Sequence, residues 1–297
     1  MIVLTLPGAP GIELSIAKAF GAKLVEVEHK TFPDGETYIR IPTDVNGEVV
    51  TIVQSMFPNQ DKRLVELLLT VETCKDLGAS KVITIIPYIA YSRQDKRFRD
   101  GEPISIKTIL KLLGSAGADT LLVVDIHKSE SLQYFPGKAI EITSLVLLGK
   151  KACEKGMENP IVLAPDLGAL KRAQRVAKEL KTEYDYMEKF RDRVTGEITI
   201  KPKEVDVSGR DVLIIDDIIS TGGTIAKASR IIKSLGARRV LVAAAHSLLI
   251  NNAYERIISS GVECIYTANT IKRAKALPKL EIIDISSEII PNLKQIL

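Results

Sequence analysis

Short apolar runs rich in valine and isoleucine alternate with longer segments of helical periodicity along the whole chain. The clearest runs cover residues 50–53, 82–86, 121–124, 161–163, 212–215 and 240–244. Most of them lack the polar alternation of a strand with one wet face, as expected when helices cover both faces of a sheet. The pattern predicts an α/β fold with mainly parallel sheets, each flanked by helices.

The hydrophobic pattern of the first half recurs in the second. The segment VVTIVQS, followed by a loop, a helix and LGASKVITIIPY, is echoed by DVLIIDD, a loop, a helix and LGARRVLVAAAH. In each copy a glycine, Gly78 or Gly236, is placed to end the helix before the next strand. The repeat predicts two related α/β domains, residues 1–143 and residues 144–297.

Composition narrows the classes of function. The 41 basic and 37 acidic residues are spread along the chain and there is no Trp, which argues against a nucleic-acid partner. Cys74, Cys153 and Cys264 are far apart and lack metal-ligand spacing, so we predict reduced thiols that fill the core of a cytoplasmic protein. We expect no membrane partner, because no apolar run reaches membrane-spanning length and the first residues lack the basic flank of a signal peptide.

The strongest local motif follows the apolar run at 212–215. Asp216 and Asp217 come first, and a loop precedes a predicted helix over 225–235; the loop residues are Ser220, Thr221, Gly222, Gly223 and Thr224. A glycine turn at a helix N-terminus exposes N–H groups that bind an anion, whereas the two acids must meet hydroxyls or a metal-bound ligand. The motif predicts a site for a sugar phosphate with a free diol. A tight turn and a capped helix without a ligand is the alternative.

This segment resembles the ribose-phosphate loop of type I phosphoribosyltransferases and of phosphoribosyl pyrophosphate synthetases. The resemblance implies that Asp216 and Asp217 hold the 2- and 3-hydroxyls of ribose and that residues 220–224 hold its 5-phosphate. No Lys follows the glycines, so the loop is not of the Walker type. Ser220 stands where many synthetases have a third acid, which makes the loop more like that of the transferases.

Two segments of the first half favour the synthetases, because a transferase needs no ATP site. The segment FPDGE resembles the synthetase turn that contacts adenine, which implies stacking by Phe32 and edge contacts from Asp34 and Glu36. The segment PYIAYSRQDK matches the synthetases over nearly its whole length and implies that Arg93 and Gln94 contact ATP. In isolation, the first segment is typical of an ordinary turn and the second of a solvated charged loop.

Two single residues at strand ends are candidate metal ligands. His127 follows the run at 121–124, and Asp166 follows the run at 161–163. The synthetases use a His and an Asp in these contexts to hold the Mg²⁺ of ATP, so the resemblance implies Mg²⁺ as the cofactor. Because Mg²⁺ prefers oxygen ligands, Asp166 is the firmer assignment. A hydrogen-bonded His and a helix-capping Asp are the structural alternatives.

The segment YMEKFRDR, ahead of a predicted hairpin turn at Thr195 and Gly196, places Lys189 and Arg191 two residues apart. On an extended segment both would lie on one face, which suits a clamp on transferring phosphates. This segment resembles the mobile catalytic loop of the synthetases. A charged surface hairpin is the alternative.

Five motifs in family order, over essentially the whole chain, resemble the phosphoribosyl pyrophosphate synthetases, or ribose-phosphate pyrophosphokinases. The resemblance implies two phosphoribosyltransferase-type domains, ATP and ribose 5-phosphate as substrates, and a homo-oligomer of two or more subunits. Residues 97–100 do not match the regulatory loop of the phosphate-activated synthetases, and the chain ends soon after a predicted helix at 285–296. The resemblance therefore does not extend to allosteric control. A phosphoribosyltransferase and a non-catalytic regulator of synthetases remain the alternatives, and AMP formation from ATP and ribose 5-phosphate would separate all three.

Overall fold

The computed structural model describes residues 1–191, 198–273 and 275–297, and between 189 and 201 it describes no side chains. The chain forms two compact units. The first comprises Met1–Thr143, Asn269–Ala274 and Asp284–Leu297, and the second comprises Ser144–Ala268 and Lys275–Ile283. The second unit is therefore not one continuous stretch from 144 to 297, because the last helix of the chain packs within the first unit.

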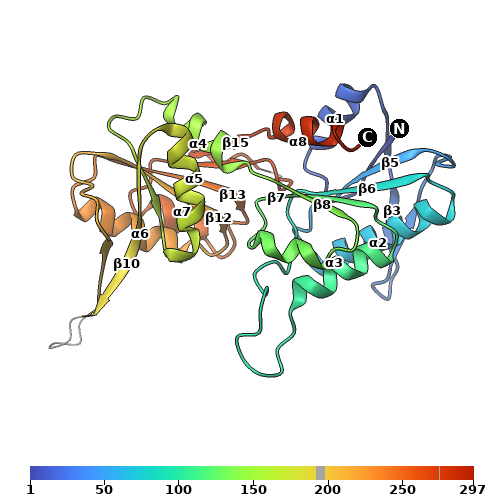
Figure 1. Ribbon diagram of the computed structural model, residues 1–297, viewed down its shortest axis with the longest axis horizontal. Helices are drawn as coiled ribbons and strands as arrows, with labels where there is room; N and C mark the ends of the chain where they lie inside the picture. The colour runs from blue at the N-terminus through green and yellow to red at the C-terminus, as the bar shows by residue number, and fades with distance from the viewer. Residues whose placement is uncertain (192–197, 274) are drawn as a thin grey trace. The chain divides into compact units, whose positions relative to one another are not determined.

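The first unit is built on a parallel sheet with helices on both faces. Its strands are β1 (Ile2–Thr5), β2 (Lys23–Glu26), β3 (Glu28–Thr31), β4 (Thr37–Arg40), β5 (Val49–Val53), β6 (Lys81–Ile86), β7 (Thr120–Val124) and β8 (Lys138–Ile142). Its helices are α1 (Ile12–Phe20), α2 (Gln60–Asp76), α3 (Ser105–Ser115), α8 (Ser286–Lys294) and the 3-10 helix η1 (Ser129–Tyr134). The sheet order is β2-β1-β5-β6-β7-β8, and β3 and β4 form a separate antiparallel pair. Helices α1 and α8 cover one face of the sheet, and α2 and α3 cover the other (Figure 1).

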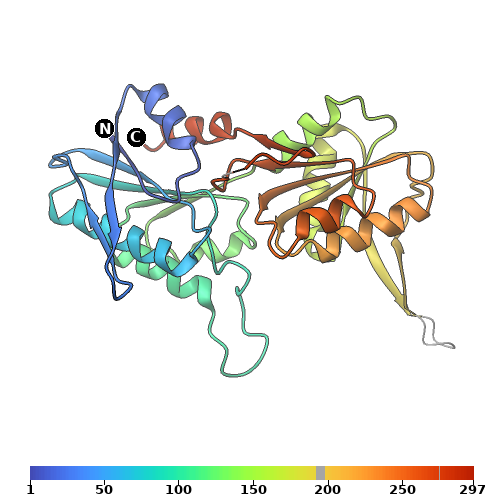
Figure 2. The same cartoon turned by 180° about the vertical axis from the view of Figure 1, so that it is seen from behind.

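The second unit repeats this arrangement. Its strands are β9 (Ile161–Ala164), β10 (Glu183–Arg191), β11 (Ile198–Pro202), β12 (Asp211–Ile219), β13 (Arg239–Ser247), β14 (Cys264–Ala268) and β15 (Leu280–Ile283). Its helices are α4 (Leu145–Cys153), α5 (Leu170–Leu180), α6 (Gly223–Ser234), α7 (Ala253–Ile258) and the 3-10 helix η2 (Leu167–Ala169). The sheet order is β11-β10-β9-β12-β13-β14-β15, and within it β11 pairs antiparallel with β10. Helices α4 and α5 pack together on one face, and α6 and α7 pack together on the other (Figure 2).

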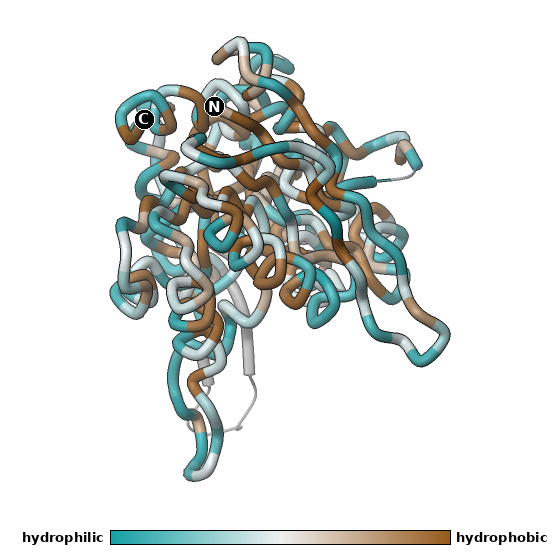
Figure 3. The backbone as a smooth tube through the Cα atoms, turned by 90° about the vertical axis from the view of Figure 1, so that its right-hand side faces the viewer, coloured by the Kyte–Doolittle hydropathy of each residue, from teal (hydrophilic) through white to brown (hydrophobic). Residues whose placement is uncertain are grey.

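The predicted fold class is confirmed, and the apolar runs account for the cores. All six predicted runs fall inside observed strands, namely β5, β6, β7, β9, β12 and β13. The apolar residues of the predicted runs are buried, as in residues 212–215, which are fully buried. Figure 3 shows many of the hydrophobic residues in the interior of the molecule, whereas the projecting loops are largely hydrophilic.

The internal repeat is also present in the backbone geometry. Gly78 and Gly236 follow α2 and α6 with φ values of 85° and 88°, a left-handed conformation that favours glycine. The carbonyl of Gly78 accepts a hydrogen bond from the N–H of Gly47 at 2.8 Å, and that of Gly236 accepts one from Gly209 at 2.9 Å. If β11 is left out, the strands of the two sheets occur in the same order. In each sheet the second strand along the chain, β2 or β10, lies at the edge next to the first strand, β1 or β9. The two units are therefore related folds.

The three cysteines are free thiols, as predicted. Cys74 is fully buried in the first unit, and burial raises the pKa of its thiol to about 12. Cys153 and Cys264 are only partly buried, and burial raises the pKa of each. These thiols therefore have little thiolate character, which fits packing rather than chemistry.

Candidate functional site

The predicted sugar-phosphate loop joins β12 to α6. Strand β12 continues to Ile219, further than the predicted run, so Asp216 and Asp217 lie within the strand and not after it. The strand is held to this length by pairing with β13, where Ile219 is opposite Ser247. Gly222 then adopts φ 73° as the N-cap of α6, and the helix begins at Gly223, two residues earlier than predicted. The loop thus delivers the acids and the N-terminus of α6 within a few residues of each other.

The two glycines of this loop have different surroundings. A Cβ atom on Gly222 would lie 2.8 Å from Cδ1 of Ile257 in α7 and 3.1 Å from the carbonyl of Ala253. A Cβ atom on Gly223, the first residue of α6, would meet no other atom within 4 Å. Gly222 is therefore required by the fold, whereas the space beside Gly223 is open to a ligand.

The two adjacent acids are close to the protein interior. Asp217 is buried, and its Oδ2 lies 3.2 Å from Nη2 of Arg172 in α5. Asp216 is partly exposed, and its Oδ1 accepts a hydrogen bond from the N–H of Asp217 at 2.9 Å. Burial, followed by repulsion from Asp217, raises the pKa of Asp216 well above its ordinary value of 3.8. Ionisation of both carboxyl groups at once is therefore unfavourable.

Arg172 lies beside the two acids, and no sequence pattern predicted it as a candidate site residue. Besides its ion pair with Asp217, it donates from Nη1 to the carbonyl of Gly168 at 3.5 Å. Only 17% of its side chain is exposed. In the sequence it is one of several cations along a helix, and its distance of 45 positions from Asp217 gives no signal of the pairing.

Asp166 lies at the same sheet edge as the two acids. Strand β9 ends two residues before it, and β9 runs parallel to β12, with Leu163 opposite Ile214. The carboxyl ends of adjacent parallel strands lie at one edge of a sheet. Asp166 is exposed, and its Oδ1 caps η2 by accepting the N–H of Gly168 at 2.8 Å. The second unit thus gathers Asp166, the two acids and the anion-binding loop at one edge.

His127 and the Arg93 loop lie at the corresponding edge of the first unit. Strands β6 and β7 are parallel neighbours, with Ile86 opposite Val123, and they lead into these two segments. His127 is partly buried and follows the buried Asp125. Arg93 is exposed, and the Oε1 of Gln94 accepts a hydrogen bond from the hydroxyl of Ser105 at 2.5 Å.

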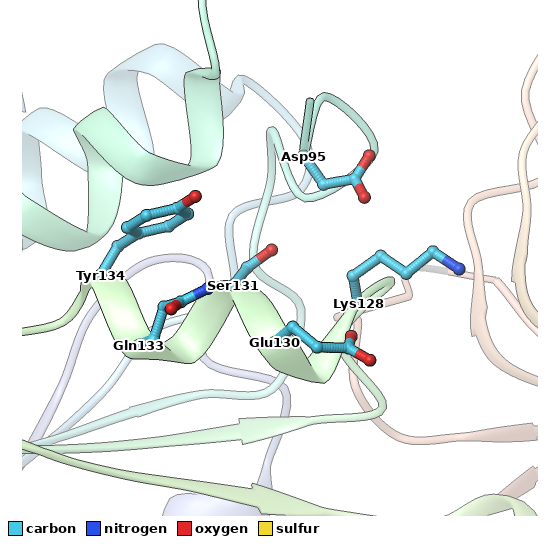
Figure 4. Close-up of a pocket in the computed structure, with 6 residues that line it drawn as sticks. All are labelled: Asp95, Lys128, Glu130, Ser131, Gln133 and Tyr134. Atoms are coloured by element: carbon cyan, nitrogen blue, oxygen red, sulfur yellow. The ribbon is translucent and has the colours of Figure 1, made fainter. Parts of the chain in front are cut away.

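A pocket of about 240 Å³ lies beside these two segments (Figure 4). Asp95, which follows Gln94, forms one wall, and residues of η1 form the other; the lining consists of Asp95, Lys128, Glu130, Ser131, Gln133 and Tyr134. The ammonium of Lys107 lies over the ring of Tyr134, 5.5 Å from its centroid. The pocket therefore joins the loop that contains Arg93 to the segment that follows His127.

Phe32, Asp34 and Glu36 form the turn between β3 and β4. The N–H of Phe32 donates to the carbonyl of Glu36 at 2.8 Å, and Oδ1 of Asp34 accepts the N–H of Glu36 at 3.1 Å. The ring of Phe32 is 38% exposed and packs edge-on against Tyr38, with centroids 6.0 Å apart. The segment is thus a turn, as its sequence alone indicates, and the ammonium of Lys30 lies over the Phe32 ring, 4.7 Å from its centroid.

Lys189 and Arg191 lie on β10, where their backbones pair with Ile200 and Ile198 of β11. Their side chains, and the predicted turn at Thr195 and Gly196, lie outside the described residues. The assignment of Lys189 and Arg191 as catalytic cations stays a prediction.

Among the described residues, no three His, Cys, Asp or Glu side chains cluster in a way that could hold a metal ion. None of the described helices combines the length and apolar content needed to span a membrane.

Comparisons with known proteins cover nearly all of the chain. Residues 1–117 match the family described as the N-terminal domain of ribose phosphate pyrophosphokinase, and residues 133–265 match the phosphoribosyl transferase domain. The ribose-phosphate pyrophosphokinase of Sulfurisphaera tokodaii is 49% identical over 97% of this chain and 99% of its own length. That of Thermococcus kodakarensis is 43% identical over 88% and 92%. The crystal structure of phosphoribosylpyrophosphate synthetase from Mycobacterium smegmatis superposes with a TM-score of 0.91 at 27% identity and covers 99% of this chain and 98% of its own.

Proposed function

The chain belongs to the ribose-phosphate pyrophosphokinase family, and we propose from this premise which of its residues carry out the reaction. The enzyme transfers the β,γ-pyrophosphoryl group of ATP to the 1-hydroxyl of ribose 5-phosphate. The products are phosphoribosyl pyrophosphate and AMP.

The β12–α6 loop is the observation that carries the assignment of the sugar site. The open space beside Gly223 admits a phosphate to the N-terminal N–H groups of α6, where the helix dipole favours negative charge. The hydroxyls of Ser220, Thr221 and Thr224 add donors. Asp216 and Asp217 accept hydrogen bonds from the 2- and 3-hydroxyls, because carboxylates would repel the phosphate itself.

The ATP site is assigned to the first unit. Phe32 stacks on the adenine ring while Asp34 and Glu36 contact its polar edge, and the partly exposed Phe32 ring is compatible with that role. Arg93 and Gln94 contact the nucleotide from the loop after β6, where Arg93 is exposed and free to approach phosphate oxygens. These assignments extend the family resemblance to individual residues of this chain.

Mg²⁺ is the proposed cofactor, and the residues present fit it. Mg²⁺ is commonly bound through one or two carboxylates together with substrate phosphates and water, without a dedicated cage of protein ligands. The exposed carboxylate of Asp166 agrees with that mode. Asp166 is the proposed oxygen ligand and His127 the proposed second contact. When bound, Mg²⁺ would neutralise charge on the phosphates of ATP.

The chemistry itself needs positioning and cationic stabilisation. The 1-hydroxyl attacks the β-phosphorus in line, the bond to the α-phosphate oxygen breaks, and AMP leaves without a covalent enzyme intermediate. We assign Lys189 and Arg191 to the phosphate oxygens on which charge develops. Homo-oligomeric assembly and a cytoplasmic location follow from the family resemblance and are part of the same proposal.

One experiment separates this function from its alternatives. The purified protein is incubated with ATP, ribose 5-phosphate and Mg²⁺ in one reaction, and with phosphoribosyl pyrophosphate and a nucleobase in another. We expect AMP in the first reaction and no nucleotide synthesis in the second. Nucleotide formation in the second reaction alone would indicate a phosphoribosyltransferase, and inactivity in both would indicate a non-catalytic regulator.

A further inference from the structure

A single arginine connects two segments of the second unit to which the proposed function gives different roles. Nη2 of Arg172 lies 3.2 Å from Oδ2 of Asp217, one of the two diol-binding acids. Nη1 of the same guanidinium donates to the carbonyl of Gly168 at 3.5 Å. The N–H of Gly168 in turn donates to Oδ1 of Asp166, the proposed metal ligand. Arg172 therefore joins the acid pair to the Asp166 loop.

We infer that Arg172 is a positioning residue for ribose 5-phosphate: it holds the Asp217 carboxylate ionised and oriented to accept the sugar hydroxyls, and it fixes that carboxylate to the Asp166 loop. The inference rests on the proposed function, because it presupposes that Asp217 binds the diol. Arg172 itself acts through Asp217 and is not assigned a contact with the substrate.

The surroundings of Asp217 explain why a cation is needed there. Its side chain is only 4% exposed, and the neighbouring Asp216 is a second carboxyl group in the same strand. Two adjacent carboxylates with little water around them favour uptake of a proton unless a cation balances their charge. A protonated Asp217 would lose acceptor capacity toward the sugar hydroxyls. Arg172, with 17% of its side chain exposed, supplies the balancing charge where water is scarce.

The shape of the guanidinium matters as well as its charge. Its two terminal nitrogens point to different acceptors, a carboxylate in β12 and a carbonyl at η2, so that one planar group sets the spacing between them. A lysine ammonium at this position is a compact charge on a flexible stem and would not reproduce both contacts in a fixed geometry. The fork therefore accounts for an arginine at this position.

The test is direct binding of ribose 5-phosphate to the full chain in the presence of Mg²⁺, measured by isothermal titration calorimetry. Loss of a hydrogen bond between charged groups in a partly buried place predicts a roughly tenfold or greater rise in the Kd for Arg172→Gln. Arg172→Lys should bind with intermediate affinity. Arg175→Gln is the matched control, because Arg175 lies on the same helix with its side chain exposed, and its Kd should equal that of the wild type.

Steady-state kinetics supply a second readout that a general loss of structure would not give. For Arg172→Gln we expect the KM for ribose 5-phosphate to rise while the KM for ATP stays near the wild-type value. Circular dichroism at the assay temperature checks that each variant is folded. If Arg172→Gln fails to fold, Arg172→Lys carries the test, and wild-type affinity in the folded Lys variant would overturn the inference.

A double-mutant cycle with Asp217→Asn tests whether Arg172 works through Asp217. If it does, Arg172→Gln adds little to the Kd once Asp217 has been replaced, whereas independent roles would give additive effects. Additive effects, or a normal Kd in Arg172→Gln alone, would refute the positioning role. Failure of the wild type to bind ribose 5-phosphate would instead refute the proposed sugar site, and the inference with it.

Discussion

Asp216 and Asp217 are neighbours in the sequence, yet the fold gives them different environments. Asp217 is buried and paired with Arg172, whereas Asp216 is partly exposed and accepts the N–H of Asp217. Burial and the charge of Asp217 raise the pKa of Asp216. Ionisation of the Asp216 carboxyl group is thus unfavourable in the ligand-free protein. Such unfavourable placement is common for residues that bind a ligand.

Asp216→Asn should therefore stabilise the protein while it weakens sugar binding. Because the folded-state pKa of Asp216 is raised above 3.8, stability falls as the pH rises from that value through the folded-state pKa. Asn cannot ionise, so we expect a gain of about 1 kcal/mol in unfolding free energy at about pH 8. Thermal denaturation of both proteins checks this. The gain should shrink toward about pH 4, where Asp216 is protonated, and a gain that does not depend on pH would contradict the explanation.

At this scale the sequence predicted the candidate residues that have a local signature and did not predict Arg172, which has none. The adjacent acids and the Gly/Thr loop were predicted because they follow an apolar run, whereas the metal role of Asp166 came from the family resemblance. Arg172 was missed because its role depends on α5 packing beside β12, which no local pattern encodes. The roles of Phe32, Arg93 and His127 came from the family resemblance, since a turn, a charged loop and a lone histidine have no distinctive local chemistry.

In the β12–α6 loop, packing near α7 requires a glycine at position 222, whereas the open space beside Gly223 is assigned to the ligand. Gly222 has a positive φ and leaves no room for a Cβ atom beside Ile257, whereas Gly223 has neither constraint. The two glycines therefore allow the contribution to folding to be separated from the contribution to binding.

Substituting the two glycines one at a time should separate the effect on protein stability from the effect on sugar binding. Gly222→Ala should cost about 1–2 kcal/mol for the left-handed backbone, with a further cost from the contact with Ile257. Gly223→Ala should leave the unfolding free energy equal or higher, because alanine suits the first turn of a helix, but its methyl group would occupy the space assigned to the phosphate. Urea denaturation and calorimetry with ribose 5-phosphate measure the two effects. Normal sugar binding by Gly223→Ala would remove the phosphate from this loop.

Strand β10 contains the residues of the remaining functional prediction. If Lys189 and Arg191 act on the transition state, Lys189→Ala should lower kcat by roughly 10²- to 10³-fold, as loss of one aimed electrostatic donor does. The KM values should change much less, because the interaction is absent from the ground state. Steady-state kinetics decide the matter. A kcat near that of the wild type in both Lys189→Ala and Arg191→Ala would leave an ordinary charged hairpin.

The strands that contain the apolar runs were predictable to within a few residues. Buried parallel strands produce apolar runs, and all six predicted runs lie within strands. The observed ends differ from the predicted ends where backbone pairing or a glycine determines them. Strand β12 extends to Ile219 through its pairing with β13, and α6 begins at Gly223 because Gly222 caps it. Such limits depend on neighbouring elements and not on the hydrophobic pattern.

At the scale of the whole molecule, the two units repeat one plan, but the chain does not divide at a single point. Helix α8 follows β15, the last strand of the second unit, yet it belongs to the first unit and contacts α1 and β8. Helix α4 follows β8 of the first unit and belongs to the second, where it contacts α5. The sequence repeat predicted two domains that meet near residue 143, and the place of α4 agrees with that boundary. It did not predict that α8 belongs to the first unit, because an amphipathic helix does not specify its partner.

The packing of α8 makes the end of the chain important for the stability of the first unit. Leu293 is fully buried, so Leu293→Ala should cost roughly 2–5 kcal/mol, as large-to-small substitutions in a core do. Lys294→Ala, at the next and exposed position, is the control. Urea denaturation followed by circular dichroism measures both. Equal midpoints for the two variants would show that α8 adds little to the core.

Pyrophosphoryl transfer is tested most directly by the identity and ratio of the products formed from ATP and ribose 5-phosphate, followed by ³¹P nuclear magnetic resonance. Transfer of a pyrophosphoryl group predicts AMP and phosphoribosyl pyrophosphate in equal amounts, with no ADP intermediate, and no product after the divalent metal is chelated. Formation of ADP in step with a ribose bisphosphate would mean that a single phosphoryl group moves, and it would contradict the account.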